Sequence, residues 1–364
     1  MDKEQQILHY IRLNPFISQQ ELANKMGISR SAVAGYIATM MKQGQIKGRA
    51  YILKEEASIT CLGGANLDRK ARSKQQVKLH SSNPVSISQS CGGVARNIAE
   101  NLGRLGCVTS LITSVGNDKE GEWVLAETKQ HGVDVSQSWM LSSEQTGTYT
   151  ALLDVDGEMF VSLANMDIYE KVTTEMIAEK WAHIVASDIV LLDTNLPEDV
   201  LAYMIKRCHD ENITLYIDPV SSAKAKKLPE SLMGVTSILP NQEEAEILSG
   251  MKINNVEDVK TACQFIRKRG ALNVIVTMGE QGIFVSSPEH EVLLPPYPVD
   301  VVDVTGAGDA FASGLLHGVL HGEELLDACR LGLAASALTL VTEQSVSPEL
   351  QPEKLYQFVK ENAQ

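Results

Sequence analysis

The stretch Asp303-Val-Thr-Gly-Ala-Gly-Asp-Ala-Phe311 places two carboxylates on either side of a small glycine-rich turn. Apolar, extended sequence at 295–302 precedes it and helical periodicity follows at 310–319, which predicts a turn between a strand and a helix. Because residues 306–308 carry little side chain, their N–H groups can approach an anion, and the helix dipole favours negative charge there. The pattern indicates phosphate chemistry.

Asp309 would lie at the start of that helix, beside the anion. A carboxylate is repelled by a phosphoryl group unless it takes a proton from the hydroxyl that attacks this group. The alternative is a helix N-cap after a tight turn, since Asp and Gly suit such positions. Such a short motif does not distinguish a catalytic carboxylate from a helix N-cap, so the distinction depends on motifs elsewhere in the chain.

The length of 364 residues predicts two or three structural units, and 44% hydrophobic with 21% charged residues is typical of a soluble globular protein. The net charge of -14 is unevenly spread. Residues 1–55 contain eight Lys or Arg against four Asp or Glu, and the remainder contains 24 against 42. A basic head on an acidic body indicates two functions.

The six cysteines contain no CxxC pair, which argues against a zinc site or a disulfide framework and predicts reduced, buried thiols. The N-terminus lacks the apolar segment of a signal peptide, and no apolar run approaches the ~18 residues of a membrane span. We therefore expect a cytoplasmic protein without a membrane partner.

The head, residues 1–55, has the pattern of three helices. The first ends at Asn14-Pro15, Ser18-Gln-Gln-Glu21 fits a capping box for the second, and the third runs from Ser29 to Lys42. Apolar and polar residues alternate over 45–53, which predicts a short β-hairpin.

This order of elements resembles a winged helix-turn-helix DNA-binding domain, with 29–42 as the recognition helix. Six residues would contact DNA, at base edges or phosphates: Arg30, Ser31, Tyr36, Lys42, Lys47 and Arg49. The alternative is a small helical domain that packs on the body or on another protein.

The body, residues 56–364, alternates short apolar strands with amphipathic helices, which predicts a mostly parallel sheet covered on both faces. Predicted strands include 58–62, 109–115, 189–192, 214–217, 237–239, 274–277 and 282–286. Residues 69–90 and 145–165 break this rhythm, the second with a hairpin around Asp156-Gly157. We expect these two segments to form a small sheet that acts as a lid.

Five motifs follow one another along the body: Gly63-Gly-Ala-Asn-Leu-Asp68, Gly92-Gly93 with Asn97, Asn241-Gln-Glu-Glu244, Thr277-Met-Gly279 and 303–309. Their order resembles the ribokinase-like PfkB family of carbohydrate and nucleoside kinases over residues 58–350. The resemblance implies a three-layer α/β/α sandwich with a small β-sheet lid, preceded by the winged helix-turn-helix head.

The resemblance also implies roles for individual residues. Substrate binding falls to Asn66, Asp68, Gly92, Gly93, Asn97, Asn165 and Asp167. Asp68, expected just beyond the end of a strand, could accept hydrogen bonds from two sugar hydroxyls, and the Asn97 amide could contact others. Asp309 becomes the general base, and the N–H groups of Gly306, Ala307 and Gly308 stabilise charge on the transferred phosphoryl group.

ATP and Mg²⁺ are the implied cofactors. Asn241 and Glu244 would hold the waters of the Mg²⁺ ion and the phosphate end of ATP, while Thr277 and Gly279 would touch the nucleotide. The neighbouring Glu243 and Glu246 are expected to be solvated helix charges. Asp303 and Thr305 match positions that hold a monovalent cation, K⁺, in some members, together with carbonyls at 341–345.

Within the family, pseudouridine kinases show the closest likeness, through Cys91 to Gly106, Asp193-Thr-Asn-Leu196 and Asp218-Pro-Val-Ser221. Arg96 replaces the Ala or Gly often found there in ribokinases. Phosphorylation of the 5'-hydroxyl of pseudouridine is therefore the expected reaction. The alternatives are uridine, inosine, guanosine or a simple sugar, or a ligand-responsive transcriptional regulator built on the kinase fold. We expect a homodimer.

Overall fold

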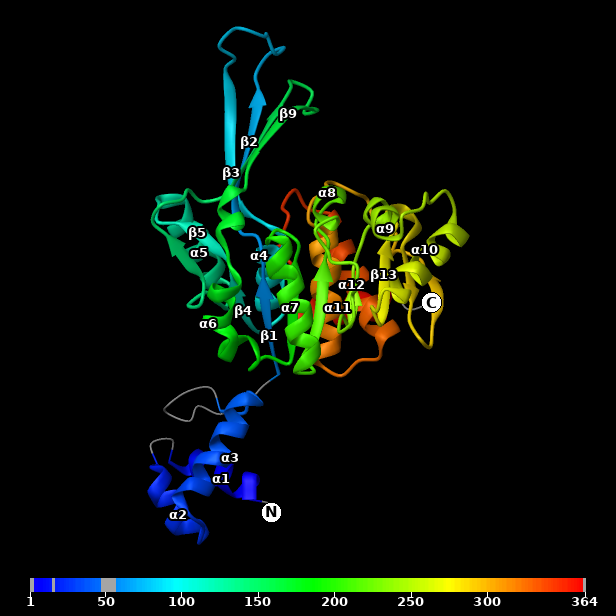
Figure 1. The fold of residues 1–364 in the computed structure, drawn as a ribbon. Helices are drawn as coiled ribbons and strands as arrows, with labels where there is room; N and C mark the ends of the chain where they lie inside the picture. The colour runs from blue at the N-terminus through cyan, green and yellow to red at the C-terminus, as the bar shows by residue number, and fades with distance from the viewer. Residues whose placement is uncertain (1–2, 15–16, 47–56, 363–364) are drawn as a thin grey trace.

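The computed structural model describes residues 3–14, 17–46 and 57–362. A small N-terminal head lies at one end of a larger α/β body (Figure 1). The head contains the helices α1 (Lys3–Leu13), α2 (Gln19–Met26) and α3 (Arg30–Lys42). They share a core of their own, formed by Ile7, Ile11, Ile17, Leu22, Ala23, Met26, Val33, Ile37, Met40 and Ile46. The hairpin predicted at 45–53, with Lys47 and Arg49, lies largely outside the described residues.

Local sequence explains the helix ends of the head. The Ser18 hydroxyl accepts a hydrogen bond from the Glu21 N–H while the Glu21 carboxylate accepts one from the Ser18 N–H, so the predicted capping box is confirmed. Gly27 ends α2 in the left-handed conformation, at φ 64°. Ser29 caps α3 through the N–H of Ala32.

The body is built on one large sheet. Its strands run in the order β15 (Glu291–Leu294), β14 (Ile283–Ser286), β13 (Asn273–Thr277), β12 (Ser237–Ile238), β11 (Thr214–Asp218), β10 (Ile189–Asp193), β1 (Ser58–Leu62), β4 (Val108–Ile112) and β6 (Val133–Asp134). All neighbours from β13 to β6 pair in parallel, and β14 and β15 add an antiparallel edge. The carboxyl ends of the parallel strands therefore meet at one edge of the sheet, where such sheets bind ligands.

Helices cover both faces of this sheet (Figure 1). Ile189 and Leu191 of β10 contribute to one core, and Val190 and Leu192 to the other, as alternation along a buried strand requires. The first core is closed by α4 (Val94–Arg104), α5 (Lys119–Gln130), α11 (Ala307–Leu320), α12 (Leu325–Leu340) and α13 (Pro352–Glu361). The second is closed by α6 (Thr174–Ile184), α7 (Glu198–Asp210), α9 (Gln242–Ser249) and α10 (Val256–Lys268). The predicted three-layer sandwich is confirmed.

A second sheet stands away from the body as a lid (Figure 1). Its strands run in the order β3 (Val85–Gly92), β2 (Asn66–Ser73), β8 (Thr148–Leu153) and β9 (Met159–Asn165). The antiparallel pairing of β8 and β9 confirms the hairpin around Asp156-Gly157. Because β2 begins at Asn66, the predicted substrate residues Asn66 and Asp68 lie on the same strand that continues into the lid.

Three local expectations were wrong. Residues 109–115 do not form one strand, since β4 ends at Ile112 and β5 (Ser114–Gly116) pairs with β7 (Trp139–Leu141) in a separate small sheet. The run at 295–302 is irregular and Val301 and Val302 are exposed, because Pro295, Pro296 and Pro298 have no N–H for a strand ladder. Asp68 lies inside β2, not beyond the end of a core strand.

All six cysteines are free and buried, as predicted. In the described part of the chain, none of the helices combines the length and apolar character that crossing a membrane requires.

Candidate active site

Asp68 and Gly92 meet where the lid joins the body. They lie on neighbouring strands, and a Cβ at Gly92 would come within 2.1 Å of the Asp68 carboxylate, so only glycine leaves room for it. Asn66 donates a hydrogen bond to Asp68 at 2.6 Å. Burial raises the pKa of Asp68 to about 6, against the opposing effects of Asn66, Arg96 and Lys70.

A buried carboxylate, Asp193 at the end of β10, ties together the two glycine motifs. Its side chain accepts hydrogen bonds from the Gly64 N–H at 2.8 Å and the Ala95 N–H at 3.0 Å. It also accepts one from the Asn195 N–H at 2.8 Å. The loop after β1 and the start of α4, where Gly93 precedes the helix at φ 102°, are thereby fixed against each other. In the sequence, Asp193 stands out only through its likeness to family members, and its position between the two glycine motifs was not predicted.

Asn97 and Asp309, 212 positions apart in sequence, are in direct contact. The Asn97 amide donates a hydrogen bond of 2.8 Å to the Asp309 carboxylate. Asp309 is in the first turn of α11, but this bond comes from α4, which argues against a simple capping role. Burial is the main reason that the pKa of Asp309 is raised to about 7, and the carboxylates of Asp193 and Asp68 raise it further.

The turn before α11 has the geometry expected of an anion site. Gly306 adopts φ 83°, and a Cβ there would lie 1.9 Å from the Ser345 carbonyl oxygen, so a side chain would block the turn. Ala307 and Gly308 follow in the first helical turn. The Ala307 N–H donates to the Val304 carbonyl at 3.3 Å, whereas the Gly308 N–H has no acceptor within the helix. Gly308 is exposed, so an anion could reach this helix end.

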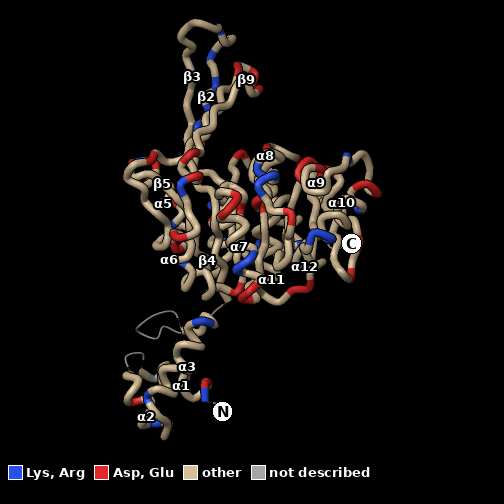
Figure 2. The backbone as a smooth tube through the Cα atoms, in the orientation of Figure 1, with Lys and Arg blue, Asp and Glu red and all other residues tan. Residues whose placement is uncertain are grey.

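Asp303 and Thr305 form a small closed arrangement beside this turn. The Asp303 carboxylate accepts hydrogen bonds from the Thr305 N–H at 2.9 Å and its hydroxyl at 2.7 Å. Partial burial raises the pKa of Asp303, but these bonds and the Lys70 ammonium outweigh it, so the net shift is downward. Lys70, 3.5 Å from Asp303, comes from lid strand β2, along which several residues are Lys or Arg (Figure 2).

The lid contributes the other predicted substrate residues. Asn165, at the end of β9, and Asp167, at the start of a short 3-10 helix (Asp167–Lys171), are exposed. The following Tyr169 is buried, and its hydroxyl accepts a hydrogen bond from the Ala65 N–H and donates one to the Ala65 carbonyl. This anchor between lid and glycine loop was missed, because a lone tyrosine in a sequence does not reveal a partner 104 positions away.

Asn241 and Glu244 form a capping box at the start of α9. The Asn241 side chain accepts a bond from the Glu244 N–H, and Glu244 accepts bonds from both the backbone and the amide nitrogen of Asn241. Burial raises the pKa of Glu244.

Next to this box is a pocket of about 560 Å³, lined by Asn241, Gln242, Glu243, Glu246, Thr277, Met278 and Gly279. Three of the four residues expected at a nucleotide therefore lie together. The expectation that Glu246 is merely solvated was wrong, because it pairs with Lys252 and accepts a hydrogen bond from the Ile253 N–H.

Asp218, at the end of β11, connects the two parts of the site. Its pKa is raised by burial, and further by the nearby carboxylates of Asp309 and Glu244. The carboxylates of Asp309 from α11 and Glu244 from α9 are thus both close enough to repel Asp218 of β11. Sequence reasoning did not assign Asp218 a role, since the packing of separate strand ends creates this cluster.

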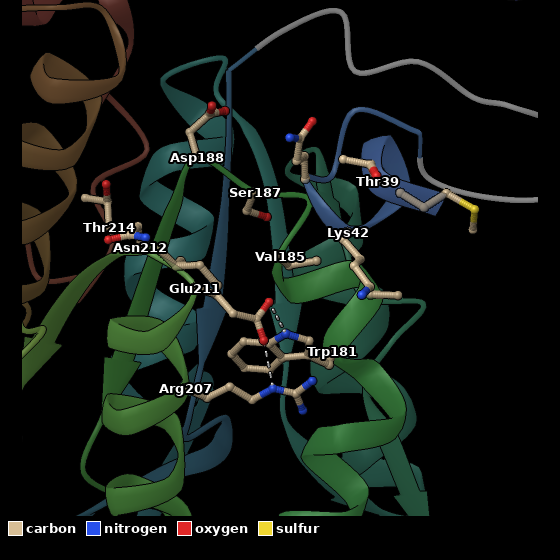
Figure 3. A pocket seen from close by; sticks show the side chains of 14 residues that line it. Thr39, Lys42, Trp181, Val185, Ser187, Asp188, Arg207, Glu211, Asn212 and Thr214 are labelled. Atoms are coloured by element: carbon tan, nitrogen blue, oxygen red, sulfur yellow. Dashed lines mark hydrogen bonds and ion pairs between the residues drawn. The ribbon is translucent and has the colours of Figure 1, made fainter. Parts of the chain in front are cut away.

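The predicted DNA-binding residues are distributed along α3. Arg30 and Ser31 are exposed near its start, whereas Tyr36 packs partly against the core of the head. Lys42, at the other end, faces the body across a pocket of about 920 Å³ (Figure 3). On the body side of this pocket the Arg207 guanidinium stacks 4.0 Å from the Trp181 ring.

Comparisons with known proteins agree with this architecture. Residues 56–351 match the pfkB family carbohydrate kinase model, and residues 2–47 match a winged helix-turn-helix DNA-binding model. The solved structure of a carbohydrate kinase from Agrobacterium tumefaciens superposes with a TM-score of 0.74 at 32% identity, covering 84% of this chain and 97% of that one.

Two Escherichia coli (strain K12) proteins are also similar. The uncharacterized sugar kinase YeiI is 31% identical over 359 residues, which cover 98% of this chain and 99% of that protein. Pseudouridine kinase is 32% identical over 313 residues, which cover 86% of this chain and 99% of that protein. The chain therefore belongs to the PfkB family of carbohydrate kinases, as a sugar or nucleoside kinase that transfers phosphate to an alcohol group and carries an N-terminal winged helix-turn-helix region.

Proposed function

We propose that this protein uses ATP to phosphorylate the 5'-hydroxyl of a nucleoside, with pseudouridine as the preferred acceptor. The hydrogen bond from Asn97 to Asp309 is the observation that carries the proposal. It places a carboxylate with a raised pKa at the start of α11, within the network that also holds Asp68. The E. coli relative named pseudouridine kinase supports the choice of nucleoside.

In this mechanism Asp309 removes the proton from the attacking hydroxyl. A base with a pKa near neutrality is suited to this step, because a large fraction of it is ionised at neutral pH and it is still basic enough to accept the proton. The Asp68 carboxylate and the lid residues Asn66, Asn165 and Asp167 hold the acceptor. N–H groups at 306–308 stabilise negative charge on the phosphoryl group in transit.

ATP is proposed to occupy the pocket beside α9, in contact with Asn241, Thr277 and Gly279. The carboxylates of Asp309 and Glu244 raise the pKa of Asp218, and a divalent cation nearby would relieve this repulsion. The described residues contain no group of three or more acidic, His or Cys side chains that could hold a metal ion by itself, which fits an ion held largely by water and the ATP phosphates. Mg²⁺, held by Glu244 through water, would neutralise charge on the ATP phosphates. Asp303, Thr305 and the Ser345 carbonyl, which lies against Gly306, are proposed to hold K⁺.

A coupled ATP-consumption screen tests the reaction. The acceptors are pseudouridine, uridine, inosine, guanosine, adenosine, ribose and fructose 6-phosphate, each with and without K⁺. We expect the highest kcat/KM with pseudouridine and a rise on adding K⁺. A nucleoside other than pseudouridine, or a sugar, giving the highest value would reassign the substrate; no turnover with any acceptor would remove the nucleoside-kinase proposal.

A second proposed function is ligand-responsive DNA binding by the head, favoured by the winged helix-turn-helix match at 2–47. Arg30, Ser31, Tyr36 and Lys42 would contact DNA, together with Lys47 and Arg49. Fluorescence anisotropy with genomic DNA fragments, with and without ATP and pseudouridine, tests this. Binding that falls in an Arg30→Ala variant supports it, and no binding in any condition removes it.

The boundary at residues 55 and 56 is proposed to separate two domains, because the head has its own core. Deleting residues 1–55 should then leave kinase turnover within about twofold of the full chain, as additivity of distant sites implies. A large loss would mean that the head supports the body.

A cytoplasmic homodimer is the proposed state. Apolar side chains of the lid, including Ile87, Phe160 and Leu163, are exposed, and exposed apolar patches mark interaction surfaces. Sedimentation equilibrium should show a dimer that Phe160→Glu weakens. A monomer at every concentration would contradict the proposal.

A further inference from the structure

Arg96 is a buried cation inside the site, on the first turn of α4. Its side chain is only 4% exposed. The guanidinium donates to the Cys91 carbonyl at 3.0 Å, the Thr128 hydroxyl at 3.2 Å and the Asn97 side-chain oxygen at 3.1 Å, and it pairs with Glu100. The guanidinium is therefore held by four polar partners.

The contact with Asn97 has a consequence for Asp309. Arginine can only donate hydrogen bonds, so the Asn97 atom that faces Arg96 must be the carbonyl oxygen. The amide nitrogen of Asn97 is then the atom that faces Asp309, at 2.8 Å. With the opposite orientation, an oxygen would face the Asp309 carboxylate and repel its ionised form.

Packing alone does not account for this arginine. Glu100 pairs with both Arg96 and Arg104, at 2.7 Å from the latter, and His131 lies 3.4 Å from both Glu100 and Glu127. Of the two arginines, Arg96 is the more deeply buried, because the Arg104 side chain is 20% exposed. Buried charges are costly, and an apolar side chain of similar volume often serves stability as well or better. The deeply buried Arg96 lies on the helix that supplies Asn97.

We propose that Arg96 is a positioning residue for phosphoryl transfer, which holds the Asn97 amide in the one orientation that donates to Asp309. This inference rests on the proposed function of Asp309 as the general base. Four charged groups face Asp309: Asp68 from β2, Asp193 from β10, Asp218 from β11 and Arg96 from α4. Three carboxylates disfavour ionised Asp309, so Arg96 is the cation that opposes them.

The test compares Arg96→Gln with Arg104→Gln. Both arginines pair with Glu100 on the same helix, but only Arg96 contacts Asn97. We would measure kcat/KM from pH 5.5 to 9 with MgATP and the acceptor that gives the highest turnover in the screen. For Arg96→Gln the acidic limb should move up by about one pH unit or more, as loss of a nearby opposite charge predicts. The acidic limb of Arg104→Gln should match the wild type.

A cycle of variants covers the case in which Arg96→Gln does not fold. Arg96→Lys retains a charge but loses the planar fork, so turnover should fall by roughly 10-fold or more, as for other residues that orient a functional side chain. If Arg96 acts through Asn97, that loss should largely vanish in an Asn97→Ala background. Additive losses, or an acidic limb of Arg96→Gln that matches the wild type, would overturn the proposal.

Asp309→Asn, assayed in parallel, distinguishes a failure of the general-base role of Asp309 from a failure of the positioning role of Arg96. Turnover that survives in Asp309→Asn would remove the general-base function and the positioning role with it. Loss of turnover in Asp309→Asn, with an unmoved acidic limb in Arg96→Gln, would remove only the role of Arg96.

Discussion

Two helices of this protein begin with the same hydrogen-bonded arrangement in opposite surroundings. At α2 the Ser18 N–H donates to Glu21 at 2.8 Å and the Glu21 N–H donates back to the Ser18 hydroxyl at 3.2 Å. At α9 the Asn241 N–H donates to Glu244 at 2.9 Å and the Glu244 N–H donates back to the Asn241 side chain at 2.9 Å. Both are capping boxes, so the local bonding pattern alone does not distinguish their functions.

Their surroundings do. Glu21 is exposed, and hydrogen bonds from Ser18 lower its pKa, so its contribution to stability is present above the unfolded pKa and is lost as pH falls through the folded one. Glu244 is 4% exposed and burial raises its pKa. The folded state then binds the extra proton, so ionising Glu244 costs stability as pH rises. Because ionised Glu244 lowers stability and lies beside the pocket lined by Asn241 and Thr277, this capping box is a candidate for a second, functional role.

Asp309 gives the largest expected effect, because it is a carboxylate at a helix start whose hydrogen bond comes from another helix. Asp309→Asn should lower kcat by about 10³- to 10⁴-fold, since no base remains for the hydroxyl proton. Acceptor binding, measured by calorimetry, should remain detectable. Asp327→Asn, an exposed carboxylate in the first turn of α12, is the matched control and should retain full turnover. Full activity of Asp309→Asn would refute the assignment.

Glu244→Gln tests the two capping boxes directly. Glutamine can still close a capping box, so α9 should persist while the charge that supports Mg²⁺ is lost. We expect kcat to fall by roughly 10- to 100-fold and to recover in part at higher Mg²⁺ concentration, as for other residues that support a metal indirectly. The same change at Glu21 should leave kinase turnover unaltered. Equal turnover for Glu244→Gln and wild type would mean that both boxes are only caps.

The pH dependence of kcat/KM gives the next effect in size. Asp309 has a raised pKa of about 7 and must be ionised to accept a proton. Activity should therefore be lost as pH falls through 7, by about tenfold for each further pH unit. Stopped assays at constant ionic strength, with ATP binding measured separately at each pH, would check this. A profile that stays flat down to pH 5.5 would contradict it.

Sequence reasoning predicted the elements that local patterns specify. Apolar runs such as 189–192 and 214–217 became β10 and β11, and the hairpin around Asp156-Gly157 formed as expected. The order of the glycine motifs predicted which residues meet, although Asn97 and Asp309 are 212 positions apart. The strands and the hairpin could be predicted from periodicity and turn residues in the single sequence, whereas the meeting of Asn97 and Asp309 was implied by the resemblance to the PfkB family.

The errors have a different origin. Asp193, Tyr169 and Asp218 act through contacts between distant segments, and nothing in their neighbours along the chain indicates that they are buried together. The capping box of Asn241 and Glu244 was not predicted, although the equivalent box was predicted for Ser18 and Glu21 in the head. The apolar run at 295–302 predicted a strand, and that prediction was wrong because its three prolines have no N–H group to pair with a neighbouring strand.

Ser18→Ala gives the smallest expected effect and examines the head's box by itself. Losing the Ser18 hydroxyl removes the bond that it accepts from the Glu21 N–H and the bond that it donates to the Glu21 carboxylate. This should destabilise α2 by about 1 kcal/mol, which is typical of an N-cap. Hydrogen exchange of the α2 amides in the full chain would report this, with kinase turnover unchanged. Ser29→Ala, which removes the single bond that caps α3, is the matched control. If Ser18→Ala also lowered turnover, the head would be coupled to the active site, and the contrast between an isolated cap and a functional one would fail.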